Sequence, residues 1–121
     1  VAGDGNCLFR SVAQGEAAAQ GRAPLPSSQE AARSGELRAA AVRELVSRRA
    51  DIEWAIEGDF DRYVAGMAKE GTWGGEPELL MLSHHLARTI EVYMRNPGLR
   101  RIQVYGEELK TCPVRVFFHG A

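Results

Sequence analysis

The sequence predicts an α+β fold with a small, mainly antiparallel sheet surrounded by helices. Two observations lead to this prediction. Apolar residues recur at helical spacing over the first two thirds of the chain, and from residue 90 onward they alternate with polar residues, as they do in strands. The segments between the last runs are short and contain turn formers, such as Asn-Pro-Gly at 96–98.

The first predicted helix covers residues 7–20, and Gly15 weakens it locally. After a proline-containing loop at 21–28, a second helix is predicted at 28–49, with a pattern that allows a break near Ser34. Its helically spaced apolar residues are Ala32, Leu37, Ala41, Val42, Leu45 and Val46.

A third helix is predicted at 60–69, since Asp59 is a favourable N-cap residue. A glycine-rich loop at 71–75 then precedes a fourth helix at 76–87, with Pro77 in the first turn, where proline is tolerated. Three strands follow. Their alternating apolar residues are Ile90, Val92 and Met94, then Ile102 and Val104, then Val114, Val116 and Phe118.

The chain of 121 residues is long enough for one compact domain and too short for two. We interpret residues 1–121 as a single domain that continues at both ends, because the chain starts at Val1 without an initiator Met or a signal pattern. Its 45% apolar and 26% charged residues are typical of a globular protein. The net charge of −1 gives no reason to expect nucleic acid or a membrane as partner, and the oligomeric state is not predicted.

Cys7 and Cys112 are the two cysteines of the chain. A secreted scaffold of this size usually carries more, so we interpret both as reduced thiols of an intracellular, cytoplasmic protein. A disulfide between them is the alternative. His84 and His85 are adjacent on a predicted helix and diverge by about 100°, so they cannot share one metal ion. No metal and no organic cofactor is expected.

Cys7 is the candidate nucleophile. It begins a predicted helix directly after a glycine-containing turn, and the unpaired amides at a helix start favour a thiolate. The same amides can stabilise the oxyanion that forms when a thiolate attacks a carbonyl. The alternative interpretation is structural, since a cysteine often serves as a small buried apolar residue.

Four segments resemble one known family. The first is DGNCLFR at 4–10, similar to the nucleophile motif of the ovarian-tumour (OTU) cysteine proteases. The others are GTWGGEPEL at 71–79, IEVY at 90–93 and VRVFFHG at 114–120, in the family's order and over nearly the whole chain. The stretch at 56–60 is most similar to the plant-type branch of that family.

This resemblance implies a papain-like cysteine protease architecture and a deubiquitinase activity with ubiquitin or polyubiquitin as partner. Cys7 would be the nucleophile and Asp4 a second catalytic residue. The oxyanion hole would consist of backbone amides of Asp4, Gly5, Asn6 and Cys7. The family's catalytic histidine is followed by an aromatic residue, whereas His119 is followed by Gly120. The resemblance therefore places the general base beyond Ala121, with His119 as the alternative.

Trp73 has two interpretations. A tryptophan is usually largely buried, so it can be a core anchor. Alternatively, its glycine-flanked loop lines the groove that receives the tail of the substrate. Two further functions stay open at this point: a catalytically silent ubiquitin-binding module, and a cysteine protease with another polypeptide substrate.

Overall fold

The computed structural model describes residues 5–95, 99–109 and 112–119. Helices come first and strands last, which confirms the predicted α+β class. In chain order, the elements are α1 (Cys7–Ala19), α2 (Ser27–Ser47), α3 (Arg49–Ile52), η1 (Glu53–Ala55), α4 (Phe60–Met67), α5 (Glu76–Leu86), β1 (Ile90–Arg95), β2 (Leu99–Tyr105), η2 (Glu107–Leu109) and β3 (Val114–His119).

The sheet has the strand order β2-β1-β3. β1 pairs with β2 in an antiparallel ladder and with β3 in a parallel one. The expected antiparallel pairing therefore holds for one of the two ladders. The second is parallel because the connection containing η2 carries the chain from β2 to the far edge of β1 before β3 begins.

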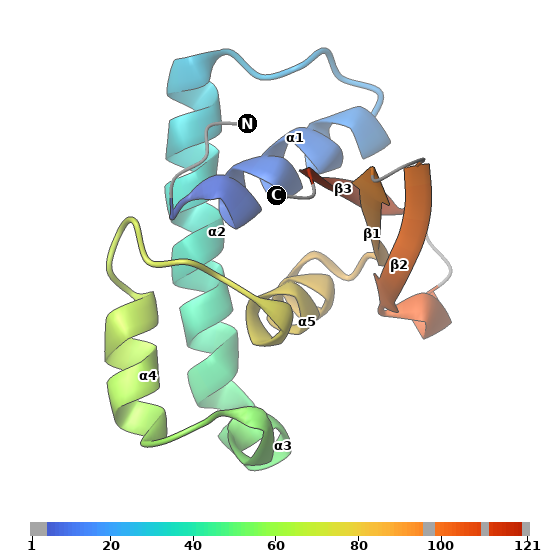
Figure 1. The fold of residues 1–121 in the computed structure, drawn as a ribbon. Coiled ribbons are helices and arrows are strands. Elements are labelled where there is room, and N and C mark those ends of the chain that lie inside the picture. The colour runs from blue at the N-terminus through green and yellow to red at the C-terminus, as the bar shows by residue number, and fades with distance from the viewer. Residues whose placement is uncertain (1–4, 96–98, 110–111, 120–121) are drawn as a thin grey trace.

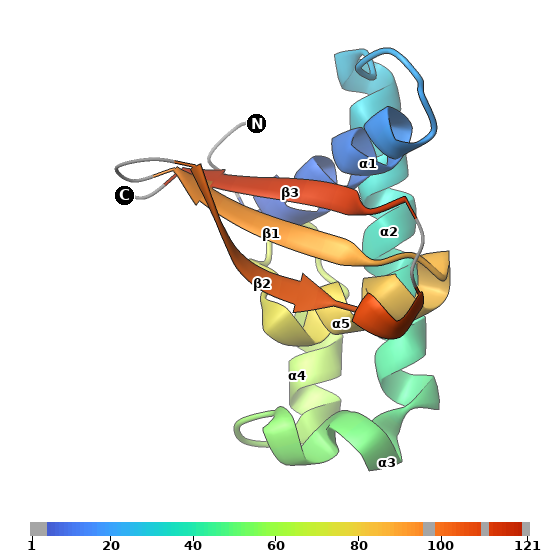
Figure 2. The ribbon, with the colours of Figure 1, turned by 90° about the vertical axis from the view of Figure 1, so that its right-hand side faces the viewer.

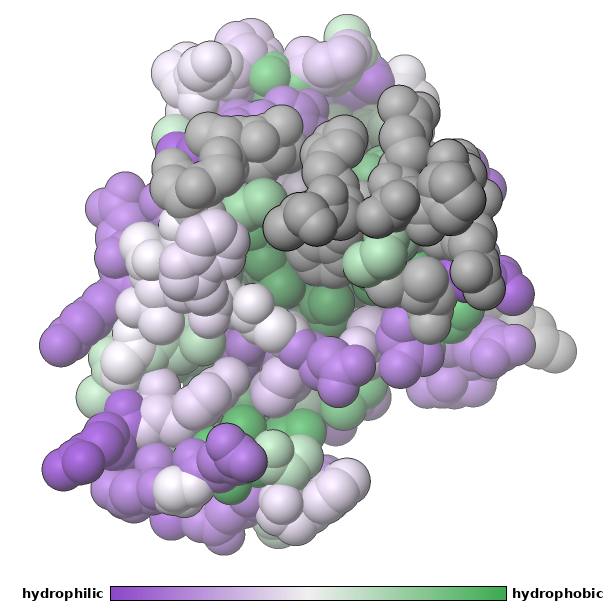
Figure 3. Space-filling model, in the orientation of Figure 1, coloured by the Kyte–Doolittle hydropathy of each residue, from purple (hydrophilic) through white to green (hydrophobic). Residues whose placement is uncertain are grey.

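Helices cover one face of the sheet, and the other face points outward (Figures 1 and 2). The covered face carries apolar residues that are at most 2% exposed: Ile90, Val92, Val114 and Val116. On the outer face, the rings of Tyr93 and Phe117 stack at 5.4 Å between centroids. In the view of Figure 3, hydrophobic residues gather near the centre of the molecule, and hydrophilic residues lie around them toward the left, lower and right edges.

Helix α2 is continuous through Ser34 and Gly35, so the break that the pattern allowed is not present. Leu37 and Leu45 lie in the core, as expected, whereas Val46 is 57% exposed. The buried stripe of α2 instead includes Ser34 and Arg38, two polar residues that the apolar pattern left out. The part of α2 that carries Ser34 and Arg38 faces the candidate site described below. No helix among the described residues is long and apolar enough to span a bilayer.

The third and fourth predicted helices are present as α4 and α5. Asp59 occupies the N-cap position of α4, although its carboxylate accepts no hydrogen bond from the helix amides. Pro77 lies in the first turn of α5, as predicted. The loop that connects these two helices, at 68–75, forms part of the site described below.

Helix α1 packs directly on β3 at Gly15. A Cβ atom there would lie 2.5 Å from the carbonyl oxygen of Arg115. At the C-terminal end of α1, the thiol of Cys112 lies 3.7 Å from the carbonyl oxygen of Ala19. β3 therefore runs from the end of α1 toward its start, and the two elements lie in opposite directions in Figure 2. About 12 Å of helix separates Gly15 from Cys7, and about 13 Å of strand separates Arg115 from the end of β3, so these two ends lie level.

We expect Gly15→Ala to destabilise the protein by about 2 kcal/mol, because the added methyl group forces α1 away from β3. Gly35→Ala is the matched control, since it also lies within a helix and a Cβ atom there would meet nothing within 4 Å. That change should stabilise the protein by about 0.5–1 kcal/mol through helix propensity. Urea unfolding measures both, and a stabilising Gly15→Ala would contradict the close packing.

Candidate active site

Cys7 is the first residue of α1 and is partly exposed. No side chain caps this helix start. Asn6 occupies the N-cap position, and its carbonyl oxygen accepts the first hydrogen bond of the helix, from the amide of Arg10 at 3.0 Å. The thiol thus lies where the sequence predicted it, at an accessible helix start, and not inside the apolar core.

The turn before Cys7 is packed against a loop far away in sequence. Gly5 is buried, and a Cβ atom there would lie 1.4 Å from the carbonyl oxygen of Gly71, so no other residue fits without displacing the loop. The amide of Gly71 donates to the side-chain oxygen of Asn6 at 2.9 Å. The side chain of Asn6 therefore joins two loops instead of capping α1.

The same loop then crosses the first turn of α1. A Cβ atom at Gly74 would lie 3.3 Å from the ring of Phe9 and 3.4 Å from the side chain of Leu8. This contact brings the glycine-rich segment at 71–75 beside the residues that follow Cys7. Trp73, within this segment, is 65% exposed, so its interpretation as a core anchor is wrong.

Arg38 of α2 connects the turn before Cys7 with the glycine-rich loop at 71–75. It is 5% exposed, and its guanidinium lies 4.5 Å from the ring centre of Phe9. Its two terminal nitrogens donate to four oxygen atoms on the surrounding segments: Asn6 Oδ1 at 2.8 Å, Thr72 O at 2.9 Å, Met67 O at 3.0 Å and Gly5 O at 3.2 Å. Burial lowers the pKa of Arg38, whereas the charges of Glu70 and Glu78 raise it.

Glu78 supports the other end of the loop. It is fully buried in the first turn of α5 and accepts hydrogen bonds from the amide of Gly75 at 2.7 Å and the hydroxyl of Tyr63 at 2.6 Å. Burial raises the pKa of Glu78, although these two hydrogen bonds and the charge of Arg38 act against it. Burial and the contact with Glu78 also raise the pKa of Tyr63.

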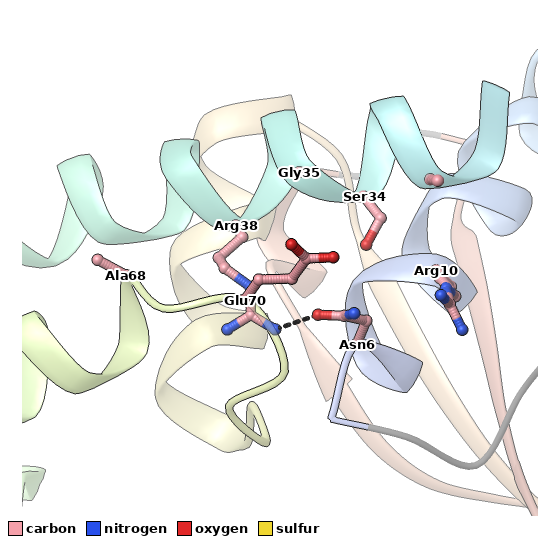
Figure 4. A pocket seen from close by; sticks show the side chains of 8 residues that line it. Asn6, Arg10, Ser34, Gly35, Arg38, Ala68 and Glu70 are labelled. Carbon is pink, nitrogen blue, oxygen red and sulfur yellow. Dashed lines mark hydrogen bonds between the residues drawn. The ribbon is translucent and has the colours of Figure 1, made fainter. Parts of the chain in front are cut away.

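A pocket of about 200 Å³ lies behind the turn, between α1, α2 and the end of α4 (Figure 4). Arg38 and Ser34 form its buried side, and the exposed residue Glu70 lies on its rim. In Figure 4, the carboxylate of Glu70 lies between Arg38 and Ser34. The pocket therefore extends from the rim at Glu70 to Arg38.

The structure brings together the turn at Gly5 and Asn6, the thiol and the loop of Trp73. Asp4 lies outside the described residues, and so does the side chain of His119. The backbone of His119 pairs with Arg95 at the end of β3, the end that lies level with Cys7. Sequence reasoning missed Arg38 and Glu78. Their signal was a charged residue at a position within a buried helical stripe.

The two cysteines are free thiols at opposite ends of α1. A helix of 13 residues separates their surroundings by roughly 18 Å, far more than a disulfide can bridge. Among the described residues, no three metal-binding side chains come together.

A family model described as OTU-like cysteine protease matches residues 2–121. The chain belongs to this family. Similar OTU proteins include two from Arabidopsis thaliana, named OVARIAN TUMOR DOMAIN-containing deubiquitinating enzymes 4 and 3. The first is 44% identical over 99% of this chain and 39% of its own length, and the second is 31% identical over 91% and 54%. The chain thus spans about two fifths to one half of these relatives.

Solved OTU domains have the same fold. The OTUD1 OTU domain superposes with a TM-score of 0.74 at 22% identity, over 98% of this chain and 75% of that one. An OTU domain solved in complex with ubiquitin gives a TM-score of 0.71 at 21% identity, over 98% of this chain and 61% of that one. These similarities confirm the OTU architecture that the sequence resemblance implied.

We expect the buried carboxylate of Glu78 to make stability depend on pH. Its pKa is raised, so the folded state binds the proton more tightly than the unfolded chain, and the free energy of unfolding should rise as the pH falls toward the usual value of 4.5. The Glu78→Gln variant keeps a side-chain oxygen that can accept from the amide of Gly75, but it cannot gain stability by binding a proton. In urea unfolding from pH 8 to 4.5, the free energy of unfolding of the wild type should therefore rise relative to that of the variant.

Glu91→Gln is the control of opposite sign. Burial by itself raises the pKa of Glu91, but hydrogen bonds from Tyr93, Arg115 and Arg101 outweigh it, and the pKa is lowered. Its contribution to stability should hold above pH 4.5 and disappear below it, so the unfolding series for Glu91→Gln and wild type is extended to about pH 3. Parallel curves for wild type and Glu78→Gln would contradict the proposed cost of the buried charge.

Proposed function

We propose that this chain forms the greater part of the catalytic domain of a thiol-dependent deubiquitinase, which hydrolyses peptide or isopeptide bonds after the C-terminal glycine of ubiquitin. The observation that supports this most directly is an accessible thiol at an uncapped helix start, on a turn that is held in place from two sides. The names of the Arabidopsis relatives and the ubiquitin-bound OTU domain support the substrate class.

In the proposed reaction, a histidine takes the proton of the Cys7 thiol, and the resulting thiolate attacks the carbonyl carbon of the terminal glycine. The carbonyl oxygen becomes an oxyanion, which backbone amides of Asp4, Gly5, Asn6 and Cys7 stabilise. The C–N bond breaks, and the leaving amine takes a proton from this histidine. Water activated by the same histidine then hydrolyses the thioester, and Asp4 supports the site. Protein groups alone are sufficient for this chemistry.

We propose that the histidine follows Ala121 and is not His119. The support is the family motif, in which an aromatic residue follows the catalytic histidine, whereas Gly120 follows His119. The end of β3 lies level with Cys7, so a histidine near the end of this strand is within reach of the thiol. The position of β3 is compatible with either histidine, and the motif favours the one that follows Ala121.

We further propose that Trp73 contacts the substrate's C-terminal tail. Its side chain is largely exposed, on a loop that crosses the first turn of α1 next to Cys7. Exposed aromatic side chains of this kind are frequent binding determinants. An intracellular, cytoplasmic location belongs to the same proposal, since both cysteines are free thiols.

Replacing the nucleophile tests the activity. In the natural protein at full length, Cys7→Ala should lower hydrolysis of a fluorogenic ubiquitin C-terminal substrate by at least about a thousandfold, and Cys7→Ser should prevent covalent capture by a ubiquitin C-terminal electrophile. Cys112→Ser is the matched control and should retain both. His119→Gln should also retain activity, whereas replacing the histidine that follows Ala121 should not.

Two other outcomes separate the alternatives. Ubiquitin binding without turnover by the wild-type protein would indicate a silent binding module. Cys7-dependent cleavage of other polypeptides, with no capture by the ubiquitin electrophile, would indicate a protease with a different substrate.

The role of Trp73 can be tested against a second exposed tryptophan. Trp73→Ala should raise the KM for the ubiquitin substrate about 5- to 20-fold and change kcat less than about threefold, because a binding contact is lost. Trp54 is 84% exposed on η1, directly after α3, which lies at the opposite end of the molecule from α1 in Figure 1. Trp54→Ala should leave both constants unchanged. Equal effects of the two changes would contradict a groove at Trp73.

A further inference from the structure

The guanidinium of Arg38 forms hydrogen bonds with the turn before Cys7 and the segments around it, and not with an acidic residue of its own helix. One of its terminal nitrogens shares its two hydrogens among Gly5 O, Asn6 Oδ1 and Thr72 O, and the other nitrogen donates to Met67 O. Three separate segments of the chain thus converge on one side chain of α2. The planar guanidinium suits this task, because its donors are held in a fixed fork, whereas a lysine ammonium on a flexible stem cannot reach all of these acceptors together.

The bond to Gly5 has a stereochemical consequence. In a trans peptide, the carbonyl oxygen and the following amide point in opposite directions. Because the oxygen of Gly5 points to Arg38 in α2, the amide of Asn6 points away from α2. The second bond from Arg38, to the side chain of Asn6, prevents this peptide from turning over. Arg38 therefore determines the direction of one amide within the turn before Cys7.

We propose that Arg38 is a positioning residue for the reaction, which holds the peptide between Gly5 and Asn6 so that the amide of Asn6 faces the developing oxyanion. This inference rests on the proposed function. The ring of Phe9, 4.5 Å from the guanidinium, fixes the plane of Arg38. Gly71 fixes Asn6 from the other side, through its own bond to Asn6 Oδ1. Arg38 acts through the turn and touches no reacting atom.

A positioning role and a purely structural role have different consequences. Misdirecting one oxyanion donor weakens binding of the transition state and leaves binding of the substrate tail intact, so kcat falls while KM changes little. A structural role would reduce the amount of folded protein and lower its melting temperature. It would not be restored by adding a small molecule to an enzyme that is already folded.

The pocket in Figure 4 makes chemical rescue feasible. It has a volume of about 200 Å³ and is lined by Arg38 on its buried side and by the exposed residues Ala68 and Glu70 on its rim. Truncation of Arg38 extends this pocket toward the oxygens of Gly5 and Asn6. Methylguanidinium is small enough to enter and carries the donors that the variant lacks.

The experiment uses the full-length protein and a fluorogenic ubiquitin C-terminal substrate. Arg38→Lys should lower kcat about 100-fold and change KM less than threefold. Arg38→Ala should be at least as impaired, and methylguanidinium at tens of millimolar should restore its kcat at least tenfold, whereas urea or methylammonium should not. Arg33→Lys is the matched control on the same helix. Arg33 pairs with Glu16, outside the turn, and its variant should keep the wild-type kcat.

Each outcome has a distinct meaning. If Cys7→Ala retains hydrolysis, the proposed function itself fails. If Cys7→Ala is inactive but Arg38→Lys keeps the wild-type kcat, the positioning role of Arg38 is wrong. The positioning role is also wrong if Arg38→Lys loses activity only in proportion to folded protein and Arg38→Ala shows no response to methylguanidinium. Should Arg38→Ala not fold, the kcat and KM of Arg38→Lys decide alone.

Discussion

The hydrogen bonds of one buried guanidinium hold the candidate site together. Arg38 lies in the middle of α2, beside the turn before Cys7 and the loop before Trp73. Both segments present backbone oxygens, and Arg38 supplies donors for them. Burying a charged group is costly, but here four oxygens and an aromatic ring replace the water that the guanidinium loses.

A second buried charge of opposite sign completes the support. Glu78 accepts from Gly75 at one end of the loop, while Arg38 donates to Thr72 near the other. The two side chains influence each other electrostatically, since Arg38 lowers the pKa of Glu78 and Glu78 raises that of Arg38. The loop between them can thus expose Trp73 to solvent and stay attached at both ends. A substrate-facing loop needs this combination of an exposed tip and fixed ends.

The contribution of the sheet to the candidate site is the direction in which β3 runs, and not a side chain. Gly15 allows β3 to approach α1 closely, and the contacts of Arg115 with Gly15 and of Cys112 with Ala19 show that the strand runs along the helix toward its start. The parallel pairing of β3 with β1 follows from the same arrangement, because the chain has to return to that edge of the sheet. The last residue of β3 therefore arrives level with Cys7. The direction of β3 thus brings the C-terminal end of the described chain to the same end of α1 as the thiol.

Local patterns in the sequence determined the α+β class, the helix that starts at Cys7 and the approximate limits of the helices and strands. These depend on spacing and turn chemistry, which neighbouring residues carry. Tertiary structure alone decided that β3 pairs in parallel, that Val46 and Trp73 are exposed, and that Arg38 and Glu78 are buried. The physical reason is that a buried charge is stabilised by partners distant in sequence. For Arg38 these partners lie 29 to 34 residues away, and no local pattern shows that they meet.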